Sequence, residues 1–182
     1  MGSAVPDAPR GAVVLIGMMG AGKTTVGSRL ARRLGWRYVD NDLAIEADAG
    51  MSVANIFATF GEEDFRRREA AFIRDALAGV GERGPVVLSV GGGAVLRPET
   101  QEAVRDAGAE VVWLRAPVDV LVERVARRRQ ERPLIAGDDP EATMRRIYAE
   151  REPVYEAVST RVVDVSTAGP DDIARAIEEW FR

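Results

Sequence analysis

The sequence predicts an α/β fold in which helices cover both faces of a parallel sheet. Two observations carry this prediction. Five short apolar runs show no polar–apolar alternation, which is typical of strands buried on both faces. Longer segments with helical periodicity separate these runs, and this β–α alternation favours parallel strands joined by right-handed crossovers. The 182 residues are enough for one ordinary domain.

The five apolar runs are the expected strands because they are rich in β-branched residues. They span residues 12–16, 38–39, 86–90, 111–114 and 162–165. The expected helices lie between and after them, at residues 23–34, 52–60, 62–78, 98–107, 118–129, 140–158 and 171–181. Pro98 and Pro170 are each followed by acidic residues, which suits the first turn of a helix. Ser52 is a weaker candidate cap.

The ends of the chain and its overall charge restrict its location and partners. Residues 1–11 are small and polar, so we expect a disordered tail before a single domain at residues 12–182. The tail lacks the basic and apolar regions of a secretory signal, and no apolar stretch approaches the ~20 residues of a membrane span. The chain has no cysteine and a net charge of −4. We therefore expect a cytoplasmic protein that binds neither membrane nor nucleic acid.

The composition also limits the catalytic chemistry. The chain has neither histidine nor cysteine. A Ser-His-Asp triad, a catalytic thiolate and a His- or Cys-ligated zinc are therefore excluded. Of the 25 lysines and arginines, Lys23 is the only lysine. Acid–base chemistry must come from carboxylates, Lys23, tyrosine or bound water.

The clearest motif lies at residues 17–25, between an expected strand and an expected helix. Its sequence, Gly-Met-Met-Gly-Ala-Gly-Lys-Thr-Thr, matches the phosphate-loop pattern G-x-x-x-x-G-K-[ST]. Its glycines let backbone N–H groups surround the β- and γ-phosphates, and the helix directs its positive N-terminus at them. Lys23 would reach the transferred phosphate, and the Thr24 hydroxyl would ligate Mg²⁺. The alternative is a glycine-rich turn that binds nothing, but the only lysine stands where the motif requires one.

The presence of a single lysine also excludes some classes of P-loop protein. A GTPase would need a guanine-reading Asn-Lys-x-Asp motif, and the only lysine is already used in the phosphate loop. Helicases and motors are usually larger and more basic. A small chain with a P-loop near its N-terminus therefore indicates a metabolite or nucleotide kinase.

Two acidic residues follow the second expected strand. Asp40 and Asp42 are two apart, so in an extended segment both carboxylates face the same way. They would lie beyond the carboxyl ends of the strands, where open α/β sheets bind ligands. One acid could act on Mg²⁺ through water and the other on an acceptor hydroxyl. The alternative is that Asp42 caps a helix beginning at Leu43, and the two roles are compatible.

Several later segments have the character of binding loops and basic contacts. In Arg66-Arg67-Arg68 at least two arginines should face solvent, while Glu69 is placed to orient Arg66. The glycines at 91–93 directly follow an expected buried strand and favour a second functional loop. Residues 127–139 resemble a mobile lid that carries arginine. Arg151 could pair with a substrate carboxylate.

These motifs, in this order, resemble the shikimate kinase family over nearly the whole chain from residue 12. The matching segments are Gly17 to Thr25, Asp40-Asn41-Asp42, Phe65-Arg66-x-x-Glu69, Ser89-Val90-Gly91-Gly92-Gly93, Arg132-Pro133-Leu134 and Arg151-Glu152-Pro153-Val154-Tyr155. The resemblance implies a three-layer P-loop kinase fold whose five parallel strands have the order 2-3-1-4-5. It also implies ATP-dependent phosphorylation of the 3-hydroxyl of shikimate, giving shikimate 3-phosphate for chorismate and aromatic amino-acid biosynthesis.

The resemblance further implies roles for individual residues. Asp42 would hold the reacting hydroxyl and act as base, and helices at about 40–80 would bind the substrate. The implied shikimate contacts are Asp42, Arg66, Gly91, Gly92, Gly93 and Arg151, with the two arginines on the carboxylate. Thr24 and Asp40 would serve Mg²⁺. The implied ATP contacts are Gly20, Ala21, Gly22, Lys23, Thr24, Thr25, Arg124, Arg132 and Pro170, and the implied catalytic residues are Lys23, Asp42 and Arg132.

Two departures from the family pattern are visible. The lid is somewhat longer and richer in arginine than in common members, so the assignment of Arg132 rests on Pro133-Leu134 after it. Asn41 stands where many members have threonine. The alternatives are another small-acid kinase, such as gluconate kinase, and a non-enzymatic P-loop nucleotide switch. We expect a monomer whose partners are the small molecules ATP and shikimate.

Overall fold

The computed structural model describes residues 11–127 and 139–182, and its centre is a five-stranded sheet. All four strand pairings are parallel, and the strand order is β2-β3-β1-β4-β5. The predicted fold class and strand order are therefore confirmed. The strands are β1 (Ala12–Ile16), β2 (Arg37–Asp40), β3 (Val86–Ser89), β4 (Glu110–Arg115) and β5 (Arg161–Asp164).

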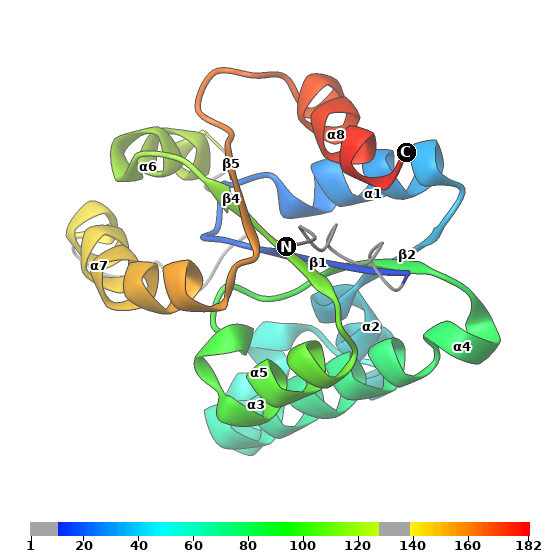
Figure 1. Cartoon of the computed structure of the whole chain (residues 1–182). Helices are drawn as coiled ribbons and strands as arrows, with labels where there is room; N and C mark the ends of the chain where they lie inside the picture. The colour runs from blue at the N-terminus through cyan, green and yellow to red at the C-terminus, as the bar shows by residue number, and fades with distance from the viewer. Residues whose placement is uncertain (1–10, 128–138) are drawn as a thin grey trace.

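Helices cover both faces of this sheet (Figure 1). Helices α1 and α8 pack together on one face, while α3 and α5 pack together on the other. The helices are α1 (Lys23–Leu34), α2 (Asn41–Ala49), α3 (Val53–Ala78), α4 (Val80–Arg83), α5 (Pro98–Asp106), α6 (Val118–Ala126), α7 (Pro140–Val158) and α8 (Pro170–Glu178). Two short 3-10 helices are η1 (Ala94–Leu96) and η4 (Glu179–Phe181).

The position of the central strands explains why their sequences do not alternate between polar and apolar residues. Every residue of β1 and β3 is buried, because helices lie above and below them. The register pairs Leu15 with Ser89 and Asp40 with Ser89, so β1, β2 and β3 end close to one another at the same edge of the sheet. The loops that leave this edge carry the phosphate-loop motif, the two aspartates and the three glycines.

The largest departure from the sequence expectation is helix α2, which begins directly after β2. Asp40 ends the strand, and its Oδ1 accepts a hydrogen bond from the Leu43 amide at 3.4 Å. Asp40 is therefore the N-cap, and Asp42 lies in the first helical turn. The expectation of an extended 40–42 segment was wrong, as was the alternative that Asp42 caps the helix.

Helices α2 and α3 share a small apolar cluster of their own, formed by Ile45, Ile56 and Phe65. Gly61 has a φ of +83° and divides α3 into two helical pieces, close to the expected division at residues 60–62. Ser52 caps α3 by accepting a hydrogen bond from the Asn55 amide, as expected. This cluster fixes the helices that carry the candidate acceptor residues.

Some of the remaining expectations concern segments that the structure describes only in part. Helix α6 ends at Ala126, short of the expected residue 129. The expected tail lies outside the described residues apart from Gly11, and so does the expected lid apart from its two ends. Within the described ranges, no helix is both long and apolar enough to cross a membrane.

Candidate active site

The phosphate-loop motif forms a tight loop between β1 and α1. Gly20 and Gly22 have φ values of +84° and +89°, a left-handed conformation that other residues rarely adopt. A side chain at Gly20 would also lie 3.1 Å from the Leu121 carbonyl oxygen. Helix α1 begins at Lys23, so its N-terminus and positive dipole end lie at the loop. The loop therefore has the local structure that the motif predicts.

Lys23 folds back over this loop. Its ammonium Nζ donates hydrogen bonds to the carbonyl oxygens of Gly17 at 2.8 Å and Met18 at 3.2 Å. Strand β3 holds the backbone of Lys23 in place, because the Ser89 hydroxyl donates a hydrogen bond to the Lys23 carbonyl oxygen at 3.1 Å. The ammonium is thus held at the phosphate loop, and its flexible stem allows it to exchange carbonyls for a phosphate oxygen.

The two predicted metal residues lie in contact. The Thr24 hydroxyl donates to Asp40 Oδ2 at 2.8 Å, and the Tyr38 hydroxyl lies 3.2 Å from the same oxygen. Burial raises the pKa of Tyr38 to about 12, so this hydroxyl stays protonated. Among the described residues, no group of three or more acidic, His or Cys side chains could hold a metal alone. Mg²⁺ that is bound with phosphates needs only one or two protein oxygens, so Thr24 and Asp40 fit that role.

Asp42 points from the first turn of α2 toward the glycine loop. Its Oδ1 is buried and has no hydrogen-bond partner in the described part of the chain. Burial raises the pKa of Asp42, and the negative charge of Asp40 raises it further, while Lys23 and Arg66 act in the opposite direction. A half-buried carboxylate with an uncommitted oxygen is suited to accept a hydrogen bond from a substrate hydroxyl.

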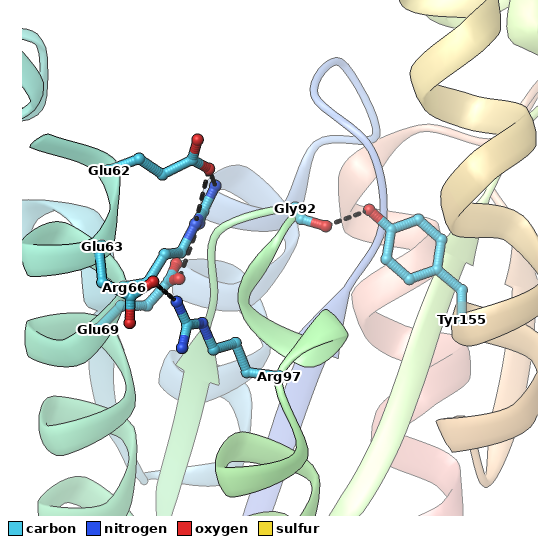
Figure 2. A network of polar contacts seen from close by, with 7 residues as sticks. All are labelled: Glu62, Glu63, Arg66, Glu69, Gly92, Arg97 and Tyr155. Atoms are coloured by element: carbon cyan, nitrogen blue, oxygen red, sulfur yellow. Dashed lines mark hydrogen bonds and ion pairs between the residues drawn. The ribbon is translucent and has the colours of Figure 1, made fainter.

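A cavity of about 560 Å³ opens at Gly93 of the glycine loop. Its lining is strongly charged and consists of Glu62, Glu63, Arg66, Gly93, Leu96, Arg97, Pro98 and Arg151. Figure 2 shows Arg66 between Glu62 and Glu69 at one side of this region. Arg66 Nη1 donates to Glu69 Oε2 at 2.8 Å, and Nη2 donates to Glu62 Oε1 at 3.2 Å. Glu69 therefore makes the predicted contact with Arg66, which is only 13% exposed.

The three adjacent arginines of α3 differ as the helical spacing predicts. Arg67 is 72% exposed and pairs with Asp64. Arg68 pairs with the same carboxylate at 2.5 Å. Only Arg66 lines the cavity, so the other two belong to the surface of the helix.

Arg151 reaches the same cavity from α7. Within the described ranges it has no carboxylate partner, whereas Arg66 and Arg97 both form ion pairs there. Arg97 donates a hydrogen bond to Glu63, as Figure 2 shows, and both residues line the cavity. Three guanidinium groups thus converge on one cavity, and that of Arg151 is available to an anion.

The three glycines at 91–93 are required for space. None of them has a positive φ among the described residues. A Cβ at Gly91 would lie 2.5 Å from Glu69 Oε1, one at Gly92 would lie 2.9 Å from Arg151 Nη1, and one at Gly93 would lie 2.8 Å from Arg66 Nη2. Each glycine therefore makes room for a charged side chain, and two of these side chains, Arg66 and Arg151, line the cavity. The sequence indicates a functional loop here but not which side chains surround it.

The predicted nucleotide residues outside the phosphate loop are only partly described. Arg124 on α6 donates to the carbonyl oxygens of Val165 at 2.6 Å and Ser166 at 3.1 Å, which ties α6 to the segment after β5. Pro170 is the first residue of α8, after that segment. Arg132 lies outside the described residues.

Sequence reasoning missed several residues at the cavity. Arg97 stands next to Pro98, which the sequence indicates only as the start of a helix. Glu62 and Glu63 follow Gly61 in a run of charges that resembles any solvated helix face. Tyr155 was recognised only as part of a motif, yet its hydroxyl donates to the Gly92 carbonyl (Figure 2). Spacing in the sequence gives no signal for these contacts, because they join α3, the glycine loop and α7.

The fold and the phosphate loop together define the P-loop kinase class, and three arginines line the cavity beside the glycine loop. The sequence model of the family described as "Shikimate kinase" matches residues 19–182. A shikimate kinase of Nitrobacter winogradskyi is 48% identical over 159 residues, which are 87% of this chain and 69% of the relative. The chain therefore belongs to the shikimate kinase family.

Solved structures agree with this assignment. The structure of the shikimate kinase from Acinetobacter baumannii in complex with shikimate has a TM-score of 0.83 and 34% identity, and the match covers 91% of this chain and 89% of that one. A gluconokinase from Sinorhizobium meliloti has a TM-score of 0.64 at 23% identity, with 96% and 93% of the two chains covered. At this identity the gluconokinase supports the fold alone.

Proposed function

We propose that this chain transfers the γ-phosphoryl group of ATP to the 3-hydroxyl of shikimate, giving shikimate 3-phosphate. The observation that carries the proposal is the cavity in which Arg66 and Arg151 converge at Gly93, with Asp42 close to Gly91 of the same glycine loop. This arrangement suits a small polyhydroxy acid, because guanidinium groups bind its carboxylate while carboxylates and amides bind its hydroxyls. The related Acinetobacter enzyme was solved with shikimate bound.

On the acceptor side, Asp42 accepts the proton of the reacting hydroxyl. Its uncommitted Oδ1 faces Gly91, where an ideal Cβ would be 3.1 Å away. Arg66 and Arg151 bind the substrate carboxylate, and the backbone of Gly91, Gly92 and Gly93 contributes close contacts. Glu69 holds Arg66 in place from a buried position.

On the donor side, the backbone of Gly20, Ala21 and Gly22 surrounds the phosphates, and Lys23 contacts the transferred group. Thr24 and Asp40 hold Mg²⁺, which supplies positive charge to the phosphates when it is bound. Thr25, Arg124 and Pro170 complete the nucleotide contacts, and Arg132 reaches the γ-phosphate. The support for these roles is the order of the motifs and the contact between Thr24 and Asp40.

The mechanism requires alignment and charge stabilisation more than covalent chemistry. Lys23 and Arg132 stabilise negative charge on the moving phosphoryl group. Asp42 receives the hydroxyl proton as the new P–O bond forms, so it needs only moderate basicity. In a chain without histidine, a carboxylate of raised pKa is the suitable base.

We also propose that the protein acts as a cytoplasmic monomer with ATP and shikimate as its small-molecule partners. The described site residues all come from one chain and converge without a second copy. Gel filtration at working concentrations tests this, and a dimer peak would contradict it.

Acceptor choice tests the proposed function directly. We expect coupled ADP release with shikimate and much slower release with quinate or gluconate. Gluconate as the best acceptor would favour the gluconate kinase alternative. Nucleotide binding with no transfer to any of the three would favour the P-loop switch.

Replacement of either carboxylate-binding arginine should weaken acceptor binding specifically. Loss of one partner from a buried charged pair costs ~2–5 kcal/mol. We therefore expect Arg66→Ala or Arg151→Ala to raise the KM for shikimate on the order of 10²-fold, with little change in the KM for ATP. Steady-state kinetics with each substrate varied in turn measures both effects.

The neighbouring arginines and a neutral substrate are the controls for this prediction. Arg67→Ala should behave like wild type, because Arg67 is 72% exposed on the same helix. Methyl shikimate, which lacks the carboxylate charge, should be a poor substrate for wild type but lose little more in the Arg66 and Arg151 variants. Equal losses for acid and ester would show that these arginines do not bind the carboxylate.

A further inference from the structure

The hydroxyl of Tyr155 lies where three parts of the site meet. It donates a hydrogen bond to the Gly92 carbonyl oxygen at 2.5 Å and lies 3.7 Å from the sulfur of Met18 in the phosphate loop. Arg151 stands one helical turn earlier on α7, and its Nη1 would be 2.9 Å from a Cβ at Gly92. One side chain therefore touches both loops of the site and shares a helix face with Arg151.

Tyr155 is held rigidly in this position. The side chain is fully buried, and its ring packs against Trp113 of β4 with 5.8 Å between centroids. Burial raises the pKa of Tyr155, so the hydroxyl stays protonated and remains a donor. A donor fixed between a strand and a helix can define the position of the flexible glycine backbone that it contacts.

The contact also fixes the direction of the next amide. In a trans peptide the C=O and the following N–H point in opposite directions, and no described peptide bond is cis. Because the Gly92 carbonyl points toward Tyr155, the Gly93 N–H points away from α7. No group in the described ranges accepts a hydrogen bond from the Gly93 N–H, and Gly93 lines the acceptor cavity.

We propose that Tyr155 is a positioning residue for the acceptor: its hydroxyl holds the Gly92 carbonyl so that the Gly93 amide is aimed at the substrate, in register with Arg151. The inference rests on the proposed function, since the substrate meant is the anionic acceptor of the same cavity. The simpler interpretation is that a buried tyrosine only needs an acceptor for its hydroxyl. That interpretation predicts a loss of stability alone.

The test is Tyr155→Phe, which removes the hydroxyl and keeps the ring. We expect the KM for shikimate to rise about tenfold, close to the loss of one oriented hydrogen bond, while the KM for ATP stays within about twofold. Tyr148→Phe is the matched control on the same helix. The Tyr148 hydroxyl donates to Glu152 at 2.9 Å, and neither residue lines the cavity, so both KM values should stay near wild type. A shikimate KM in Tyr155→Phe equal to that of the control would overturn the proposal.

A second measurement tests the positioning role of Tyr155 independently of the proposed function. Without substrate, amide hydrogen exchange of residues 91–96 should become faster in Tyr155→Phe relative to the strands β1 and β3, and it should be unchanged in Tyr148→Phe. Faster exchange in an enzyme that does not use shikimate would support the positioning role and reject the proposed function. Unchanged exchange at residues 91–96 would reject the positioning role whatever the acceptor is.

A second variant covers the case in which Tyr155→Phe folds poorly. Gly92→Ala disturbs the loop at this contact and at Arg151 together, because the added Cβ would lie 3.3 Å from the Tyr155 hydroxyl oxygen and 2.9 Å from Arg151 Nη1. It should also raise the shikimate KM more than the ATP KM. An equal rise in both would contradict the proposal, since the loop would then serve the nucleotide as much as the acceptor.

Discussion

Replacing Lys23 by alanine is expected to abolish phosphoryl transfer, with kcat reduced on the order of 10³-fold or more. The ammonium is held at the phosphate loop by the Gly17 and Met18 carbonyls, where a phosphate oxygen can replace them. No second lysine exists in the chain to take over. The measurement is single-turnover transfer at saturating ATP and shikimate, which separates the chemical step from binding.

A second variant, Lys23→Arg, tests whether the ammonium group itself is required. Lys23→Arg keeps the charge but introduces a planar fork in place of a compact ammonium. We expect it to remain severely impaired, although every other basic residue of the chain is already arginine. Thermal unfolding of both variants should stay close to wild type, because the loop also has a backbone hydrogen bond from the Ala21 amide to the Met18 carbonyl. Turnover of Lys23→Arg within a few-fold of wild type would contradict the role given to Lys23.

The fold and the phosphate loop could be predicted from sequence because their signals are local. The apolar composition of a run such as residues 12–16 is enough to indicate a strand that is buried on both faces. The loop after it is defined by residues a few positions apart, and its glycines adopt the left-handed conformations that explain their presence. Such features need no knowledge of the tertiary structure.

The 40–42 segment shows where local reasoning failed. The spacing of Asp40 and Asp42 was interpreted as an extended segment, but α2 begins directly at Asn41. Aspartate suits both a strand end and a helix cap, so its presence does not decide between them. The structure still brings the two acids near each other, since the charge of Asp40 contributes to the raised pKa of Asp42.

Arg66 and Arg151 were predicted from the sequence, but the other charged residues of the cavity and the contacts of the glycine loop were not, for another reason. Arg97 and Glu63 are 34 positions apart, and Tyr155 and Gly92 are 63 positions apart. Their contacts depend on how α3, η1 and α7 are placed around the end of the sheet. The need for glycine at 91–93 has the same origin, because the side chains that occupy the space come from α3 and α7.

Replacing Asp42 by asparagine is expected to lower activity and raise stability together. The amide still accepts a hydrogen bond from the substrate hydroxyl but cannot take its proton, so kcat should fall ~10²–10⁴-fold while the KM for ATP changes little. Because Asp40 supplies the helix cap, a loss of activity cannot be attributed to a lost cap at Asp42. Activity close to wild type in Asp42→Asn would show that Asp42 is not the base.

The stability change has a defined pH dependence. The folded state raises the pKa of Asp42 above its ordinary value of 3.8, chiefly by burial, so ionising this group costs more in the folded than in the unfolded chain. The penalty is fully present above the folded pKa, diminishes as the pH falls through that value, and vanishes below 3.8. Asp42→Asn removes the ionisation, so its Tm should exceed that of wild type at pH 7 and the difference should shrink as the pH is lowered toward 4. Asp75→Asn, at an exposed ion pair away from the cavity, is the control that should show no such gain. A Tm difference that is absent at pH 7, or that grows on acidification, would show that Asp42 is not held as a costly carboxylate in the folded enzyme.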